Sequence, residues 1–246
     1  MDPGGKGIAI LRTELTPLDN TLSVIRESTM QTYDIKKDRK DLYAPRAGGF
    51  EIVEVPPLDF LMVDGHGDPN TSTAYHEAIE ALYGASYSVR SVAKARLGKL
   101  NTIGPLEGLW SADDLTAFRK RDKSAWDWTM MIAQPEWVTA DLVEEALSAA
   151  RKKRLPALGL IRLEHYAEGR SVQILHVGAY DDEGPTLERL HRDFLPASGF
   201  VPRGRHHEIY LSDARRTEPA RLKTILRQPV SKLTAASSAA IGKATN

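Results

Sequence analysis

The sequence contains no cysteine among its 246 residues, and it has no excess of charge of either sign. The first absence excludes disulfides, zinc–thiolate and iron–sulfur sites and a cysteine nucleophile. Lys plus Arg and Asp plus Glu each number 33, whereas proteins that bind nucleic acid phosphates normally carry a basic excess. Apolar runs are only a few residues long, too short to span a membrane. We therefore predict a soluble cytoplasmic protein with no nucleic acid and no membrane partner.

The two ends of the chain differ from its middle in composition. Residues 1–33 begin with several glycines and show no sustained hydrophobic period, so they are predicted to form a poorly ordered N-terminal extension. Residues 231–246 are small and polar, which predicts a disordered tail. The folded domain is predicted over residues 34–230. Hydrophobic residues make up 41% of the whole chain, which is enough for a domain of this size to bury a sizeable core.

The hydrophobic period changes repeatedly within this domain. Turn and cap residues, among them Thr139, Pro185 and Gly199, predict where the helices begin and end. The predicted strands are 51–55, 58–63, 106–110, 126–132, 158–166, 171–177, 206–211 and 222–226, and the predicted helices are 74–96, one following Thr139, and 185–199.

Short segments recur in the two halves of the domain. MVDG precedes the first helix as LHVG precedes the last, LEGLW matches HEIYL, and IAQP matches LRQP. One half alone would bury little apolar surface. We therefore predict an α+β fold in which two βαββ modules, about 50–135 and 168–230, join into one antiparallel sheet with a pseudo-two-fold axis.

The segment HHEIYLSD holds the main candidate for chemistry. In a strand, His206, Glu208 and Tyr210 face one side and His207 the other, so the adjacent histidines are not predicted to bind one metal ion. Glu208 is then either an exposed sheet carboxylate or the acid of a pocket. Glu107 in LEGLW occupies the matching place in the repeat, so two acids are expected to approach the axis. No metal or other cofactor is predicted.

Aromatic residues gather in the first half of the domain. Core packing is the default role for tryptophan, and we expect at least one of Trp110 and Trp137 to face a cleft instead. Tyr83 and Tyr87 lie on the preceding predicted helix. Tyr180, in GAYDDE, follows a strand and is either a plain turn residue or part of a site.

Seven segments in order, DLYAP, FLMVDGHGDPN, GPLEGLW, W-x-W-T-M-M-I-x-Q-P, HVGAYDDEGPTLERLH, HHEIYLSDARRTEP and LKTILRQPV, resemble the GyrI-like small-molecule-binding superfamily, and in particular its stand-alone branch. The resemblance spans about residues 41–230. It implies two SHS2-type βαββ modules that form a curved sheet with a ligand cleft between them. Members include effector domains of multidrug-responsive regulators, a gyrase-inhibitory protein, and proteins that hydrolyse cyclopropanoid genotoxins of the yatakemycin and duocarmycin class.

The resemblance also implies roles for individual residues. The pocket carboxylate falls on Glu208 and the family's tyrosine on Tyr180, although Ala179 replaces the proline that the family has before this tyrosine. Substrate contacts are assigned to Trp110, Trp137, Tyr83, Tyr87, Tyr210, Glu107 and His176.

The function implied is hydrolysis of an activated cyclopropane by water that Glu208 deprotonates, which gives self-protection or drug resistance. The alternative is a non-catalytic protein that sequesters cationic aromatic compounds. In both cases the partner is an aromatic small molecule, and the oligomeric state stays open.

Overall fold

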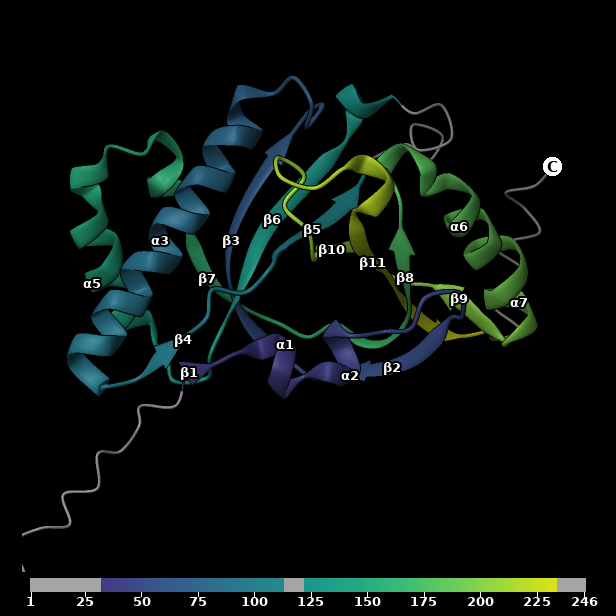
Figure 1. Ribbon diagram of the computed structural model, residues 1–246, viewed down its shortest axis with the longest axis horizontal. Helices are drawn as coiled ribbons and strands as arrows, with labels where there is room; N and C mark the ends of the chain where they lie inside the picture. Colours follow the sequence, from purple (N-terminus) through teal and green to yellow (C-terminus); the bar gives the residue numbers. More distant parts are fainter. Residues whose placement is uncertain (1–31, 113–121, 234–246) are drawn as a thin grey trace, which may run out of the picture.

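The computed structural model describes residues 32–112 and 122–233. Its centre is a curved, open, antiparallel sheet with strand order β2-β8-β11-β10-β5-β6-β3-β7, in which β9 also pairs with β11 (Figure 1). The strands are β2 (Glu51–Val55), β3 (Leu58–His66), β5 (Leu106–Ser111), β6 (Asp127–Gln134), β7 (Arg162–Tyr166), β8 (Gly169–Val177), β9 (Phe200–Pro202), β10 (His206–Tyr210) and β11 (Lys223–Lys232). The predicted α+β class is confirmed.

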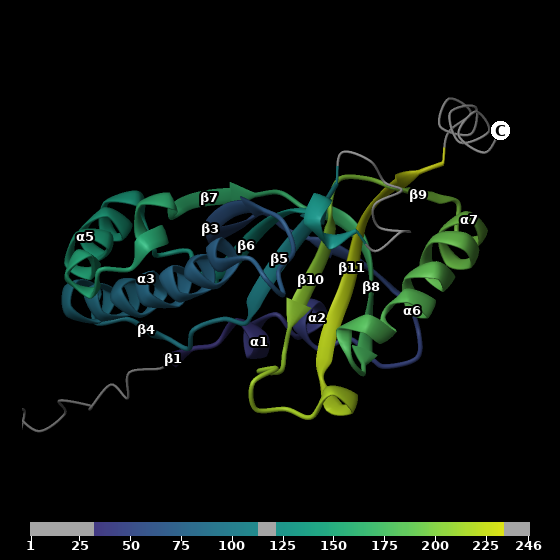
Figure 2. The same ribbon diagram turned by 90° about the horizontal axis from the view of Figure 1, so that it is seen from above.

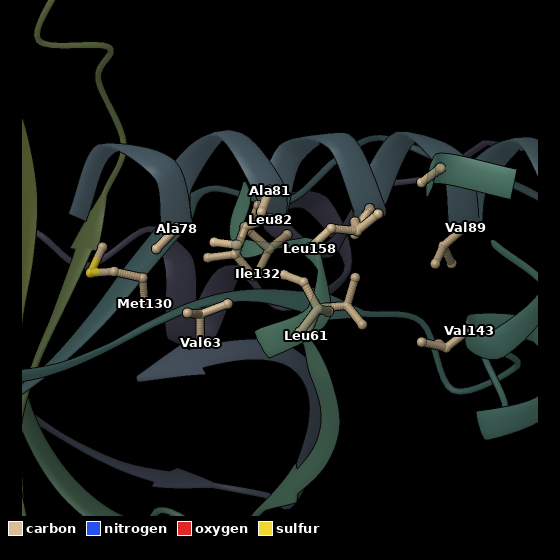
Figure 3. Close-up of a cluster of buried hydrophobic side chains, with 14 of the residues drawn as sticks. Leu61, Val63, Ala78, Ala81, Leu82, Val89, Met130, Ile132, Val143 and Leu158 are labelled. Atoms are coloured by element: carbon tan, nitrogen blue, oxygen red, sulfur yellow. The ribbon is translucent and has the colours of Figure 1, made fainter. Parts of the chain in front are cut away.

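The long helix α3 (Thr73–Leu97) covers one end of this sheet. The Ser72 side chain accepts a hydrogen bond from the backbone of Tyr75 at its start, and Gly98 ends it in a left-handed conformation with φ of +63°. Its buried face is rich in alanine, which lets the helix pack close to the strands below. Figure 3 shows this contact, made by Ala78, Ala81, Leu82 and Val89 against Leu61, Val63, Met130 and Ile132.

Helix α5 (Ala140–Ala150) packs against the outer side of α3, and Thr139 caps it as the sequence predicts. On the same face of the sheet, but at its other end, lie α6 (Gly184–Arg189), a π-helical turn over Leu190–Phe194 and α7 (Leu195–Ala197). Their Leu190 and Leu195 pack on Val172 of β8. Helices α3 and α6 therefore cover the two ends of the same face, and the central strands lie between them (Figure 1).

A short N-terminal segment covers the opposite face of the sheet. It contains α1 (Ile35–Asp38) and α2 (Lys40–Tyr43), and its Ile35, Leu42 and Tyr43 are buried in a second core with Leu109 and Ile209. Two single-turn helices have no readable hydrophobic period, so no element is predicted here from the sequence.

The edges of the predicted domain also differ from the structure. Thr32 and Tyr33, assigned to the extension, form β1 (Thr32–Tyr33), which pairs in parallel with β4 (Leu100–Asn101). Ser231 and Lys232, assigned to the tail, continue β11 and pair with β9. The rest of the predicted extension and tail lies outside the described residues.

One predicted strand begins later than expected. Pro156–Leu160 forms a 3-10 turn that starts with proline, and the strand begins at Arg162. Among the helices of the described ranges, none combines the length and the apolar composition needed to cross a bilayer.

The order of the strands brings the two halves of the chain together at the centre. The segment β3-α3-β5-β6 forms one end of the sheet and the segment β8-α6-β10-β11 the other, and they meet where β5 pairs with β10 (Figure 2). In this pairing Glu208 lies opposite Gly108.

Candidate functional site

Glu208 lies on β10, in the middle of the sheet. This strand belongs to the second half of the chain and pairs with β5 of the first half. Its neighbours across the sheet are Gly108 on β5 and Leu226 on β11. The pairing puts it on the face that α3 and α6 cover, together with His206 and Tyr210, as the period of two predicts. Its side chain is 16% exposed, so Glu208 is a largely buried acid and not an exposed sheet carboxylate.

Two hydrogen bonds in series orient this carboxylate. Tyr210 Oη donates to Glu208 Oε2 at 2.8 Å, and Trp110 Nε1 donates to Tyr210 Oη at 3.0 Å. Gly108 makes room for them, since a Cβ at this position would lie 2.9 Å from Trp110 Nε1 and 3.2 Å from Tyr210 Oη. The carboxylate is therefore held by side chains from both halves of the chain.

Burial changes the acidity of Glu208 and of a second acid, Glu183. Burial raises the pKa of Glu208 to about 7, although the Tyr210 hydrogen bond and the charges of His207 and Lys123 act in the opposite direction. Burial and the charge of Glu208 raise the pKa of Glu183 to about 9. A carboxylate that titrates near neutral pH is suited to accept a proton from water.

Aromatic rings surround this pair of acids. The Tyr180 ring lies edge-on to the Tyr210 ring, with centroids 5.6 Å apart, and Tyr180 is 39% exposed. The ring of Tyr75, in the first turn of α3, packs against the ring of Trp110, with their centroids 6.2 Å apart. The Trp126 ring packs against the same Trp110 ring, with centroids 5.6 Å apart. The site thus combines carboxyl groups with rings on which a flat ligand can stack.

His176 lies near this group, on β8. It pairs across the sheet with Thr224, which in turn pairs with Tyr210. Its Nε2 is 3.3 Å from the carbonyl oxygen of Ala179. This contact fixes the loop that carries Tyr180.

The substrate contacts assigned from the sequence include three further aromatic residues. Trp137 follows the end of β6 that is far from Trp110, and it packs edge-on against Tyr33 at 5.3 Å with Lys99 Nζ over its ring. Tyr83 lies two turns beyond Tyr75 on α3 and packs against the core. Tyr87 is 54% exposed. The structure places Trp137 away from Glu208. Tyr83, in contrast, lies near Asp213, whose charge also acts on Tyr180.

The expectation that Glu107 joins Glu208 is wrong. Glu107 pairs with Ile209, one position away from the pair of Gly108 and Glu208, so its side chain points to the opposite face of the sheet. There it is fully buried, accepts a hydrogen bond from Tyr43 Oη at 2.9 Å, and lies 2.9 Å from His207 Nε2. The two acids therefore lie on opposite faces of the sheet.

Glu107 belongs instead to a buried ionic cluster behind β10. His207 Nδ1 lies 3.1 Å from Glu168, whose other oxygen lies 3.2 Å from Arg227 Nη1. Arg227 also donates to the carbonyl oxygen of Leu42 at 2.7 Å. Two acids and two bases are thus paired without solvent contact, which identifies the cluster as a structural element.

Sequence reasoning missed three residues of the site, Glu183, Tyr75 and Trp126. Glu183 is the last residue of the HVGAYDDE segment, which had been singled out only for its tyrosine. Tyr75 opens the helix after GHGDPNTST, where position alone gives no sign that the ring reaches Trp110. Within the described ranges, no group of three or more His, Asp or Glu side chains is arranged to hold a metal ion.

Comparison with known proteins places this arrangement in a family. The GyrI-like small molecule binding domain model matches residues 49–230. A solved structure of an uncharacterized conserved protein from Listeria innocua is 38% identical, with a TM-score of 0.74, and the match covers 81% of this chain and 100% of that one. Two Listeria innocua structures described as hydrolases are 36% and 35% identical, with TM-scores of 0.73 and 0.71, and cover 82% and 81% of this chain and 100% of each of their own. No curated protein matches. The chain belongs to the family of GyrI-like small-molecule-binding domains.

Proposed function

We propose that this protein binds flat aromatic molecules between α3 and α6, and that it hydrolyses the activated cyclopropane of cyclopropanoid genotoxins of the yatakemycin and duocarmycin type. The observation that carries the proposal is Glu208, a largely buried carboxylate whose pKa is raised to about 7 and whose orientation is set by Tyr210 and Trp110. The small-molecule-binding family and the relatives described as hydrolases support it. Such an activity gives self-protection or drug resistance in the cytoplasm.

We further infer that the two halves are SHS2-type modules related by a pseudo-two-fold axis near the pair of Gly108 and Glu208. The same order of strand, helix, strand and strand in each half supports this, as does the pairing of their middle strands. In this register Trp110 corresponds to Tyr210. The ligand then lies where the modules meet, under α3 and α6.

The reaction does not need a strong nucleophile, because the substrate is already activated. A cyclopropane conjugated to a dienone stores ring strain, and its opening restores an aromatic phenol. Water forms a bond to the less substituted ring carbon, the carbon–carbon bond breaks, and its electron pair passes into the ring system as a phenolate. Glu208 accepts the proton of the water, and this proton then returns through solvent to the phenolate.

The remaining side chains position water and substrate. Tyr210 and Trp110 hold the carboxylate, and Tyr180 is placed to orient the water from the exposed side. The rings of Tyr75, Tyr180 and Trp126 offer stacking surfaces for a flat substrate, each worth about 0.5–1.5 kcal/mol beyond the area that it buries.

The variant Glu208→Gln tests the general-base role. It keeps the shape of the side chain but cannot accept the proton, so we expect kcat to fall by about 100-fold or more while the Kd of a duocarmycin-type compound changes by less than about threefold. Product formation is followed by chromatography and binding by tryptophan fluorescence. Glu164→Gln, an exposed glutamate on the edge strand β7, is the matched control. Hydrolysis at the parental rate by the Glu208 variant would refute the assignment.

A second candidate function is sequestration of cationic aromatic compounds without chemistry. The observation that favours it is the pair of acids, Glu183 and Glu208, among aromatic rings, since a cation gains from both kinds of contact. Incubation of the protein with a cyclopropanoid compound decides between the two. A ring-opened, hydroxylated product supports hydrolysis, whereas unchanged compound that co-purifies with the protein supports sequestration.

A further inference from the structure

Glu183 is a buried acid that the reaction above does not use. It follows the 3-10 turn Tyr180–Asp182 and stands at the N-cap position of α6, where a side-chain oxygen can accept a hydrogen bond from the first turn of the helix. Its side chain makes no capping hydrogen bond. Glu183 therefore does not serve as a side-chain cap of α6.

The side chain is instead turned toward the sheet. Glu183 is 5% exposed, and within the described ranges its Oε1 is buried without a hydrogen-bond partner. The hydroxyl of Thr224 is near enough to lower the pKa of Glu183. Thr224 is the neighbour of Tyr210 in the sheet, so Glu183 lies beside the residue that holds Glu208.

The two carboxyl groups thus come from separate elements and differ in their contacts. Glu208 stands on the central strand β10 and is oriented by Tyr210, whereas Glu183 comes from the loop before α6 and has an oxygen free to donate or accept. Tyr210 donates a hydrogen bond to Glu208 and so favours its ionised form, whereas Glu183 Oε1 has no donor in the described part of the chain and the charge of Glu208 raises the pKa of Glu183. When the pair of acids holds a single proton, Glu183 therefore carries it.

We infer that Glu183 is the proton donor of this site and that, together with Glu208, it also opens aryl epoxides to vicinal diols. The inference rests on the function proposed above, because it uses the same base and the same water. It extends the substrate class from carbon rings that open to a phenolate to three-membered rings with an oxygen that must be protonated.

The oxygen of water bonds to the benzylic carbon of the epoxide while Glu208 accepts one proton of the water. The carbon–oxygen bond of the ring breaks, its electron pair goes to oxygen, and Glu183 gives that oxygen a proton. A proton then passes through solvent from Glu208 to Glu183, which restores both groups. An alkoxide is far more basic than a phenolate, so epoxides depend on the donor more strongly than cyclopropanoid dienones do.

The test compares two substrates on the full-length protein. Styrene oxide and a duocarmycin-type compound are incubated separately with the parent, with Glu183→Gln and with Asp182→Asn, an exposed carboxyl in the same loop, as control. We expect the parent to form phenylethanediol above the spontaneous rate. In Glu183→Gln we expect the rate of epoxide hydrolysis to fall, and the ratio of epoxide to cyclopropane hydrolysis to drop by about tenfold or more. Asp182→Asn keeps the parental ratio.

A second measurement needs no variant. In the parent, the pH profile of epoxide hydrolysis has a falling alkaline limb where Glu183 loses its proton, and the profile of cyclopropane hydrolysis lacks this limb. Absence of diol, identical profiles for the two substrates, or an unchanged ratio in Glu183→Gln overturns the inference. Failure of the parent on the cyclopropanoid compound instead overturns the function proposed above, so the two failures are distinguishable.

Discussion

Tyr210 controls the protonation of Glu208 through a single hydrogen bond of 2.8 Å. This bond favours the ionised carboxylate and so lowers the pKa of Glu208 against the effect of burial. A hydrogen bond to a charged group contributes about 1.5–3 kcal/mol, which corresponds to about one to two pH units. In Tyr210→Phe we therefore expect the acidic limb of the pH profile of kcat/KM to move upward by about one unit.

Tyr33→Phe is the matched control for this experiment, because Tyr33 lies on β1 and packs against Trp137, away from Glu208. Its profile should coincide with that of the parent. The role given to Tyr210 is wrong if the limb stays in place while only the maximal rate falls, since that pattern indicates a loss of geometry without a change in acidity.

At the scale of single residues the sequence predicted alternation but not register. The period of two in HHEIYLSD correctly separated Glu208 from His207. It could not show that Glu208 faces Gly108 and not Glu107, because a shift of one residue between strands changes the face of every side chain and leaves no trace in either segment. Glu107 was assigned to the site for this reason.

Among the elements, the junction of β5 and β10 depends most on one glycine. A methyl group at Gly108 would lie 2.9 Å from Trp110 Nε1 and 3.2 Å from Tyr210 Oη, so Gly108→Ala must displace one of the two rings. Overpacking of this kind costs about 1–3 kcal/mol. We expect Gly108→Ala to have a lower Tm. We also expect its rate of hydrolysis to fall by more than the loss of folded protein explains.

Gly49→Ala provides the comparison, since nothing lies within 4 Å of a Cβ at that position. Thermal unfolding and product formation are measured for both variants at a temperature at which both are folded. A Gly108→Ala protein with parental activity would show that the series from Trp110 to Glu208 does not matter for turnover.

The elements that the sequence predicted well carry their own local signals. Thr139 caps α5, and the stretch predicted as a helix from Pro185 to Gly199 forms as α6, the π-helical turn and α7. In the segments α1 and α2 the local signal is the cap of α1 by Asp34, and burial of Leu42 and Tyr43 against the sheet holds both short helices in place. Their existence follows from the tertiary fold, which a local pattern does not contain.

Across the whole molecule, the ionic cluster behind β10 ties together parts of the chain that are far apart in sequence. Arg227 on β11 reaches the backbone of α2 at Leu42, while His207 on β10 joins Glu107 on β5 to Glu168 before β8. The sequence does not predict this cluster, because its residues come from separate segments and none of them forms a recognisable motif there. The cluster makes the stability of the protein depend on pH in both directions.

On the acidic side the dependence comes from Glu168. Burial raises its pKa, but the charges of His207 and Arg227 outweigh burial and lower it from 4.5 to about 2. The stabilisation is therefore complete above about pH 4.5 and is lost as the pH falls toward 2, and it amounts to about 3 kcal/mol.

On the alkaline side the dependence comes from His207. Burial alone lowers its pKa, but the charge of Glu168 and the hydrogen bond to Glu107 raise it above 6.5. Its stabilisation is complete below pH 6.5 and is lost as the pH rises through the raised value. Glu183 and Glu208 act in the same direction, because their pKa values are raised as well.

The free energy of unfolding in urea is thus expected to be highest near pH 4.5, where the contribution of Glu168 is complete and the decline caused by Glu183 and Glu208 begins, and to fall on both sides. His207→Gln leaves two buried acids with one base, so it should cost about 3–5 kcal/mol at pH 5.5 and flatten the alkaline decline. His165→Gln, an exposed histidine beside Asp59, should leave the curve unchanged. If the parent is instead most stable near pH 8, His207 is neutral in the folded protein. The pairing of His207 with Glu168 then adds no stability, and α2 is joined to the sheet by the hydrogen bond from Arg227 to the carbonyl oxygen of Leu42.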